Sequence, residues 1–135
     1  MTTPGYSGKP LINKLGFKPG LIVVTLDAPE NYLELLGRDF QVETSLENLT
    51  PNAVHVFVKE RLRLDAVLTD LMPKIDRDGM VWVSWPKKSS KVPTDIDENG
   101  IREICLPMGW VDVKVCAVSD IWSGLKLVIR KELRR

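Results

Sequence analysis

Three continuous apolar runs, rich in β-branched residues, stand out along the chain. They cover residues 21–26, 53–58 and 80–85. None of them alternates between apolar and polar positions, and unbroken runs of this kind are typical of strands covered on both faces of a parallel sheet. We therefore expect three buried strands that lie side by side in one sheet.

Apolar residues three or four positions apart predict helices around these strands. Pro29 and Gly37 flank one such segment in the order expected for a helix start and a helix end. Thr94 or Asp95 is the expected N-cap of the last helix, and Pro107 and Gly109 are expected to close it. The predicted helices cover residues 11–15, 30–36, 59–72 and 95–106.

Two further segments, 111–118 and 125–130, alternate between apolar and polar residues, and residues 119–124 form the loop between them. Alternation and a short link predict an antiparallel hairpin. Strands that alternate with helices imply parallel pairing. The expected fold class is thus α/β: one Rossmann-like, three-layer domain over residues 1–135, with a mostly parallel sheet that ends in an antiparallel hairpin. Such a hairpin resembles the last two strands of the Rossmann-like methyltransferase fold.

Composition agrees with one ordinary globular domain. The chain has 135 residues, of which 44% are hydrophobic and 27% charged. Lys and Arg number 19 and Asp and Glu 18, a net charge of +1 that gives no general attraction to nucleic acid or to an anionic membrane. We predict neither as a partner. Residues 1–9 are predicted to be a flexible arm, and 40–44 a short strand.

The location predicted from the sequence is the cytoplasm. The first residues contain no apolar stretch typical of a secretory signal, and no apolar run is long enough for a membrane span. The two cysteines are too few for a disulfide framework, which favours a reducing compartment.

Five long motifs carry a family resemblance. They include Gly-Tyr-Ser-Gly, Trp-Pro-Lys-Lys and Trp-Ser-Gly-Leu-Lys, and the chain resembles a bacterial family catalogued only as a domain of unknown function over nearly its whole length. The resemblance implies a small cytoplasmic bacterial protein. It implies no activity and no catalytic residue. The motifs lie at residues 5–10, 28–36, 83–88, 111–118 and 122–131.

The turn after the first strand is the first candidate site, because ligands of such sheets bind at the carboxyl ends of the strands. It contains Asp27, Pro29, Glu30 and Asn31, and no glycine. Dinucleotide and methyl-donor sites normally place glycines here. Pro29 lacks an N–H donor, and the two carboxylates would repel a phosphate. We favour a fold-stabilising turn and predict no cofactor. In the alternative, Asp27, Glu30 and Asn31 lie near a methyl donor.

The segment after the third strand is the second candidate site. Its lysines and serines could hold a phosphate or carboxylate, with Trp85 as a partly exposed platform. The competing interpretation is a solvated loop. No P-loop pattern accompanies the segment. Its candidate residues are Trp85, Lys87, Lys88, Ser89, Ser90 and Lys91.

Other reactive side chains are given structural roles. His55, the only histidine, lies in the middle of a strand, where a packed imidazole with one hydrogen bond is expected. No nucleophile elbow accompanies it, so a histidine-based hydrolase is not expected. Cys105 and Cys116 are expected to be buried thiols, and no metal site is predicted. Trp122 is a further partly exposed indole that could anchor a ligand.

The functional hypotheses fall into three classes. The preferred one is a non-catalytic binding module for a protein partner or a small anionic ligand. The alternative is a small S-adenosylmethionine-dependent methyltransferase-like enzyme. A third is a homodimer formed through an exposed sheet edge or the tryptophan loop.

Overall fold

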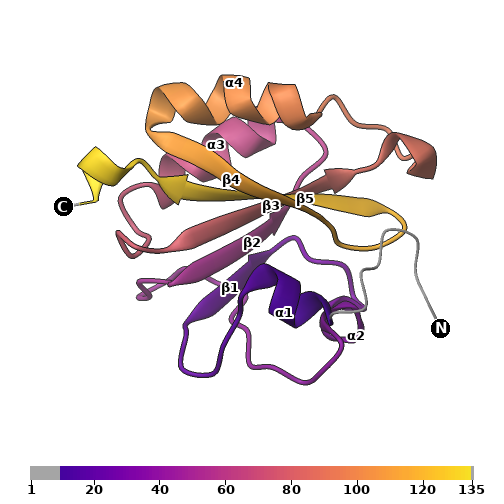
Figure 1. Ribbon diagram of the computed structural model, residues 1–135, viewed down its shortest axis with the longest axis horizontal. Coiled ribbons are helices and arrows are strands. Elements are labelled where there is room, and N and C mark those ends of the chain that lie inside the picture. The colour runs from indigo at the N-terminus through magenta and orange to yellow at the C-terminus, as the bar shows by residue number, and fades with distance from the viewer. Residues whose placement is uncertain (1–9, 135) are drawn as a thin grey trace.

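The computed structural model describes residues 10–134, and a five-stranded sheet lies at their centre (Figure 1). The flexible arm predicted for residues 1–9 lies outside the described part. All four predicted helices and all five predicted strands of the main pattern are present. The helices are α1 Leu11–Leu15, α2 Tyr32–Leu36, α3 Arg61–Leu71 and α4 Glu98–Met108, with short 3₁₀ turns at Lys88–Ser90 and Lys131–Leu133. The strands are β1 Val23–Leu26, β2 Ala53–Phe57, β3 Met80–Pro86, β4 Trp110–Ala117 and β5 Trp122–Ile129.

The strand order across the sheet is β1-β2-β3-β5-β4. β1, β2 and β3 run parallel, whereas β5 is antiparallel to both of its neighbours. The prediction of an α/β fold with a terminal antiparallel hairpin is confirmed. The prediction of a mostly parallel sheet is only half right, because the second strand of the hairpin inserts beside β3 and makes two of the four pairings antiparallel.

Both faces of the sheet are covered by helices, as the unbroken apolar runs predict (Figure 1). Val54 and Val56 of β2 belong to the apolar core beneath α3 and α4. Ala53 and Phe57 of the same strand point the other way, into the core beneath α1 and α2. Every residue of β2 is therefore buried.

The start of α4 differs from the prediction. Asp97 caps this helix, because its carboxylate accepts a hydrogen bond from the Gly100 amide at 2.7 Å. Asp95 instead accepts a hydrogen bond from the Arg61 amide at 2.7 Å and so caps α3 from a distant part of the chain. Thr94 and Asp95 were therefore the wrong candidates, since a tertiary contact uses them. The end is only half as expected: Pro107 lies inside α4, whereas Gly109 ends the helix in the left-handed conformation as predicted.

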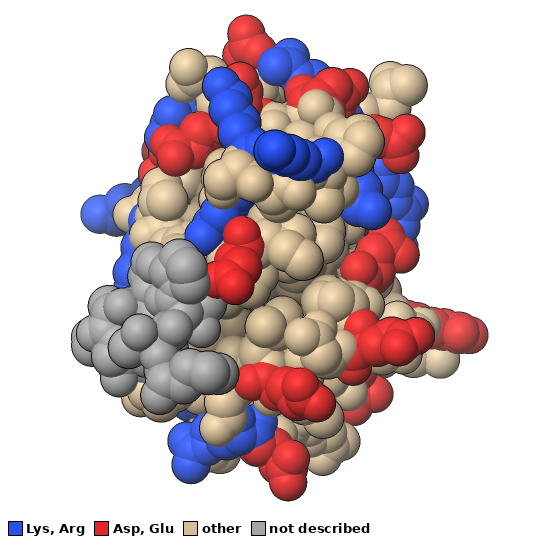
Figure 2. Space-filling model, turned by 90° about the vertical axis from the view of Figure 1, so that its right-hand side faces the viewer, with Lys and Arg blue, Asp and Glu red and all other residues tan. Residues whose placement is uncertain are grey.

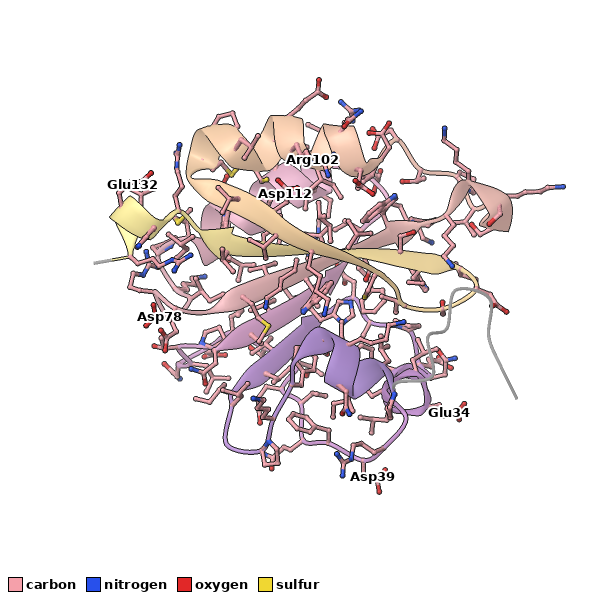
Figure 3. The ribbon with its side chains drawn as sticks, viewed as in Figure 1. Glu34, Asp39, Asp78, Arg102, Asp112 and Glu132 are labelled. Carbon is pink, nitrogen blue, oxygen red and sulfur yellow. The ribbon has the colours of Figure 1, made fainter. Side chains whose placement is uncertain are left out.

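Arg102 fastens α4 to the last strands. Its guanidinium lies 2.9 Å from an Asp112 carboxylate oxygen on β4 and 2.7 Å from one of Glu98, one turn earlier on α4 (Figure 3). Hydrogen bonds to Asp112 and Glu98 raise the pKa of Arg102 further above its ordinary value.

Within the described residues, no helix is long and apolar enough to cross a membrane.

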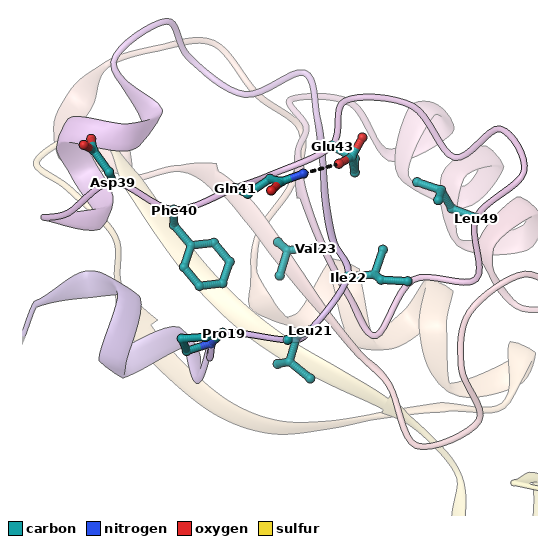
Figure 4. A pocket seen from close by; sticks show the side chains of 10 residues that line it. Pro19, Leu21, Ile22, Val23, Asp39, Phe40, Gln41, Glu43 and Leu49 are labelled. Carbon is teal, nitrogen blue, oxygen red and sulfur yellow. Dashed lines mark hydrogen bonds between the residues drawn. The ribbon is translucent and has the colours of Figure 1, made fainter.

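The predicted strand at 40–44 is reduced to one bridge. Glu43 exchanges two backbone hydrogen bonds of 2.8 Å with Val23 and Thr25 on the outer edge of β1. A cavity of about 510 Å³ lies along this edge, between β1 and residues 39–43 (Figure 4). Residues 19–23, which line it, lead into the amino end of β1, whereas ligands of such sheets bind at the carboxyl ends of the strands.

Candidate functional site

A second cavity, of about 440 Å³, opens at the carboxyl ends of β1 and β2. Figure 2 looks onto this end of the molecule, where tan atoms occupy the middle and charged side chains of both signs surround them. We call this cavity the edge pocket. Its position is the one at which ligands of open α/β sheets bind. The edge pocket is lined by Asp27, Pro29, Phe57, Val58, Lys59, Glu60, Arg63 and Trp122.

The turn after β1 forms one wall of the edge pocket. Asp27 has a φ of +58°, in the left-handed region that favours glycine. Aspartate is one of the few other residues that adopt it readily, because its short polar side chain can hydrogen-bond locally. The chain therefore makes the tight turn without the glycine whose absence counted against a cofactor site. Asp27 keeps a side chain that a glycine would lack.

Two aromatic rings form the inner wall. The rings of Phe57 and Trp122 meet edge to face, with centroids 5.0 Å apart and planes at 87°. Phe57 is the last residue of β2 and is buried, whereas Trp122 begins β5 and is half-buried. The register of β5 places Trp122 opposite Pro86, at the carboxyl end of β3. The antiparallel strand thereby brings an indole to the edge where the parallel strands end.

An ion pair crosses the mouth of the edge pocket. A guanidinium nitrogen of Arg63, in the first turn of α3, lies 3.2 Å from a carboxylate oxygen of Asp27. Both side chains are more than half exposed, and such pairs contribute only about 0–1 kcal/mol to stability. Lys59 and Glu60 add one charge of each sign. The mouth therefore offers carboxylates and cations that a ligand could engage at little energetic cost.

A buried hydrogen-bonded chain lies behind the aromatic wall. The His55 imidazole has Nδ1 2.7 Å from the Tyr32 hydroxyl and Nε2 2.7 Å from the Ser84 hydroxyl. Burial lowers the pKa of His55 to about 3 and raises that of Tyr32. The prediction of a packed histidine is confirmed, but with two hydrogen bonds instead of one. Both ring nitrogens are engaged, so His55 is not placed to exchange protons with a ligand in the edge pocket.

Of the residues predicted after the first strand, the structure brings one to the edge pocket. Asp27 lines it, whereas Glu30 and Asn31 lie outside the lining and are exposed at the start of α2. Trp85 is only 7% exposed and packs beneath α3 and α4 with Ile96 and other core residues. The expectation of a partly exposed Trp85 platform is therefore wrong, because its side chain points to the helix-covered face of a central strand.

The lysine and serine segment forms its own compact turn. Residues 88–90 make one turn of 3₁₀ helix, in which the Ser90 hydroxyl donates to the Lys87 carbonyl at 2.6 Å. Lys91 follows in the left-handed conformation, with a φ of +61°. Lys88, Ser89 and Lys91 are exposed, and the segment lies outside the lining of the edge pocket. The two predicted candidate sites are therefore not parts of one cavity.

The sequence reasoning missed the residues after the second strand. Lys59, Glu60 and Arg63 follow the carboxyl end of β2, and the rule that located the turn after β1 also applies there. Apart from the turn after β1, Trp122 is the lining residue of the edge pocket that the sequence indicates as a ligand anchor. What joins these residues to Asp27 is the parallel pairing of β1 with β2, which aligns Leu26 with Val56.

Asp95, Asp97 and the two cysteines lie outside the lining of the edge pocket, where they cap helices or are at least partly buried. Asp95 and Asp97 cap helices, and among the described residues no group of three or more His, Cys, Asp or Glu side chains could hold a metal ion. Cys105 is buried, and burial raises the pKa of its thiol to about 11. Cys116 is only partly buried, which corrects the expectation of a fully buried thiol.

Comparison with known proteins finds solved structures that resemble this fold. No protein-family model and no curated protein matches the chain, so the resemblance to a family of unknown function stays a prediction. Magnesium protoporphyrin IX methyltransferase from Synechocystis PCC 6803 with bound SAM matches with a TM-score of 0.57 at 17% identity, covering 89% of this chain and 74% of that one. Ribosomal protein L11 methylase from Lactobacillus delbrueckii subsp. bulgaricus matches with a TM-score of 0.56 at 12% identity, covering 88% and 74%.

A third solved structure extends the likeness. A protein in the NADB-Rossmann superfamily from Streptococcus agalactiae has a TM-score of 0.56 at 8% identity and covers 93% of this chain and 70% of that one. At such identities the likeness shows the fold alone, a Rossmann-like α/β fold of the methyltransferase type. The preferred hypothesis of a non-catalytic binding module is corrected by this finding, because these neighbours include methyltransferases and one holds SAM. The comparison favours the alternative.

Proposed function

We propose that the chain is a methyltransferase-like enzyme that binds S-adenosylmethionine in the edge pocket. The observation that carries the proposal is an aromatic-walled cavity with a charged mouth at the carboxyl ends of β1 and β2. The fold is shared with methyltransferases, one of which is solved with SAM. Fold likeness alone does not specify an activity, so the proposal depends on the chemistry of the pocket.

The lining residues fit the chemical groups of this cofactor. The half-buried Trp122 ring, backed by the buried Phe57 ring, suits a flat adenine ring and, as an aromatic face, a sulfonium cation. The Asp27 carboxylate can accept hydrogen bonds from an ammonium group or from ribose hydroxyls. Arg63 can pair with a carboxylate in a bidentate manner. The pocket thus has candidate partners for the charged end of the cofactor, for its sulfonium and for its adenine face, and Asp27 makes the turn that glycine usually makes.

When bound, S-adenosylmethionine supplies an activated methyl group on its sulfonium. The chain's own residues would bind and orient it: the rings exclude water from the inner wall, and the charged mouth fixes the polar end. At about 440 Å³, the edge pocket is near the lower end of the range for small-molecule sites, roughly 300–1,000 Å³. It has room for one such ligand, so a methyl acceptor would approach through the open mouth.

Isothermal titration of the full chain with S-adenosylhomocysteine tests the proposal. We expect saturable binding, weakened about tenfold by Arg63→Met, because the loss of one charged hydrogen bond costs about 1.5 kcal/mol or more. Trp122→Leu removes the indole face and should weaken binding to a similar extent. Lys88→Met is the matched control, because this exposed lysine lies outside the pocket lining and its loss should change nothing.

Two outcomes would overturn the proposal. One is the absence of binding by the wild-type chain up to about 1 mM ligand, which corresponds to a binding free energy weaker than about −4 kcal/mol. The other is a loss of affinity in Lys88→Met as large as that in Arg63→Met.

A further inference from the structure

The hydrogen-bonded chain of Tyr32, His55 and Ser84 joins three elements behind the edge pocket. Tyr32 is the first residue of α2, His55 lies in the middle of β2, and Ser84 lies on β3. All three side chains are buried, with exposures of 5%, 0% and 0%. The fold has therefore placed three polar groups in an apolar core, where each needs a partner.

The direction of the hydrogen bonds follows from the chemistry of the donors. A phenol is a stronger acid than an aliphatic hydroxyl, so Tyr32 is the better donor to a basic ring nitrogen. The Tyr32 O–H then donates to Nδ1 of His55, and the Nε2–H of His55 donates to the Ser84 oxygen. In this arrangement the imidazole is neutral, in agreement with its burial.

Tyr32 is also a main attachment of α2 to the sheet. The helix has only five residues, and Tyr32 and Leu36 are its two buried ones. Among the described residues, no side-chain hydrogen bond caps the start of α2 at Asn31. The Tyr32 ring also packs edge to face on Phe57, with centroids 5.7 Å apart. The Tyr32 hydroxyl therefore adds a directional hydrogen bond that holds α2 in place. Packing of two side chains alone would leave such a short helix free to shift.

The hydrogen bond from Tyr32 to His55 also holds the wall of the edge pocket in place. Asp27 and Pro29, which line the pocket, belong to the turn that leads directly into α2, and the Tyr32 amide donates to the Pro29 carbonyl at 3.1 Å. A displacement of Tyr32 would thus carry the turn with it. Phe57, on which the Tyr32 ring packs, belongs to the inner wall of the pocket.

We propose that Tyr32, held by His55, is a positioning residue that fixes the turn from Asp27 to Asn31 in its binding-competent place. The role rests on the proposed function in so far as the edge pocket binds a ligand. Tyr32 does not itself line the pocket, so it acts through the turn. Binding sites gain affinity when such walls are ordered before the ligand arrives.

Hydrogen–deuterium exchange of the full chain tests this role without any ligand. Tyr32→Phe keeps the ring and removes only the hydroxyl. We expect amides of residues 28–33 to exchange about tenfold faster than in the wild type under native conditions, because the local opening becomes easier. Ser84→Ala is the matched control: it also leaves one His55 nitrogen unpaired, but it leaves the Tyr32 bond in place. We expect its effect on residues 28–33 to be small.

A ligand readout separates this role from a general loss of stability. Affinity for S-adenosylhomocysteine should fall about tenfold in Tyr32→Phe and little in Ser84→Ala, even where both variants unfold at the same urea concentration. If Tyr32→Phe fails to fold, His55→Gln serves as the second variant. Its amide can still reach Ser84 but not Tyr32, so it must accelerate exchange in residues 28–33.

The inference is overturned if Tyr32→Phe and Ser84→Ala accelerate exchange of residues 28–33 equally. It is also overturned if the acceleration in Tyr32→Phe is no larger in this turn than in the buried strand β2. Failure of the wild-type chain to bind S-adenosylhomocysteine would refute the proposed function only, because the exchange comparison needs no ligand.

Discussion

The ring of Trp122 packs edge to face on that of Phe57, with centroids 5.0 Å apart, and so links the start of β5 to the end of β2. The two residues are 65 positions apart in the chain. Their strands are not neighbours, because β3 lies between them in the sheet. The contact therefore forms only when the antiparallel hairpin has inserted beside β3.

We expect this contact to contribute to stability as well as to binding. Trp122→Leu keeps an apolar side chain but loses the aromatic pair, which contributes about 0.5–1.5 kcal/mol beyond its buried area. Urea unfolding should therefore show a loss of about 1 kcal/mol or more. Trp122→Phe is the control, because it keeps a ring for Phe57. Equal stability of Trp122→Leu and Trp122→Phe would mean that ring geometry adds nothing here.

Acid should destabilise the protein through His55. In the folded state its pKa is about 3, below the ordinary 6.5, because burial disfavours the imidazolium. The unfolded chain takes up a proton as the pH falls through 6.5, and the folded protein does not until about pH 3. Stability contributed by neutral His55 is thus complete above pH 6.5 and decreases below it, by about 1.4 kcal/mol per pH unit.

Urea unfolding at several pH values between 6.5 and 5 measures this effect. His55 is the only histidine in the chain, so no other imidazole titrates there. The expected loss across this interval is about 1.7 kcal/mol, because the slope is half its full value at pH 6.5 and approaches it towards pH 5. In His55→Gln the dependence should flatten. A wild-type stability that is constant from pH 6.5 to 5 would show that folded His55 takes up its proton over the same pH range as the unfolded chain.

Alanine is expected to destabilise the protein more at Gly79 than at Gly20, although only Gly20 of the two has a positive φ. Gly20 has a φ of +95°, and a Cβ added there meets nothing within 4 Å. A Cβ added at Gly79 would lie 2.9 Å from the backbone oxygens of Asn52 and Asp76. Gly20→Ala carries left-handed strain of about 1–2 kcal/mol. Gly79→Ala forces backbone to move and should cost about 3 kcal/mol or more.

Thermal or urea unfolding of the two variants decides the order. Gly79 precedes β3, and the Asn52 oxygen that its Cβ would meet also accepts the Met80 amide at 3.0 Å. The clash therefore lies where β2 and β3 begin, and it should lower the stability of the whole sheet. If Gly20→Ala proves the more damaging variant, the backbone around Gly79 yields more easily than its contacts indicate.

The two cysteines should differ in reactivity. Burial raises the pKa of Cys105 to about 11 and also raises that of Cys116, which is only partly buried. Alkylation needs the thiolate and access to it. Iodoacetamide at about pH 8, near the ordinary thiol pKa, should therefore modify Cys116 slowly and Cys105 only after unfolding. Mass spectrometry with and without urea gives the measurement, and faster labelling of Cys105 than of Cys116 in the folded protein would contradict it.

Local patterns along the chain predicted most of the elements, because burial and backbone geometry are encoded over a few residues. The unbroken apolar run at 53–58 became the fully buried strand β2, and Gly37 ended α2 in the left-handed conformation. The errors occurred where a distant group took over a local role. Asp95, expected to cap its own helix, caps α3 instead.

The candidate site was predictable only in part for the same reason. Asp27 is predictable because the carboxyl end of a strand is a local feature, but the absence of glycine from this turn argues against a cofactor site there. The structure showed that aspartate itself adopts the left-handed turn. Trp85 looked equally suitable by position, but the strand next to it and the helices above it bury its indole.

The local hydrophobic pattern therefore established which segments are strands and helices, because unbroken apolar runs predict β1, β2 and β3, alternation predicts β4 and β5, and apolar residues three or four positions apart predict the helices. The order of the strands depended on tertiary packing, since β5 pairs with β3 through contacts some 40 residues apart in sequence. That pairing brings Trp122 to the carboxyl edge, where it meets Phe57. Without it the chain holds an aspartate, a phenylalanine, an arginine and a tryptophan, but no pocket.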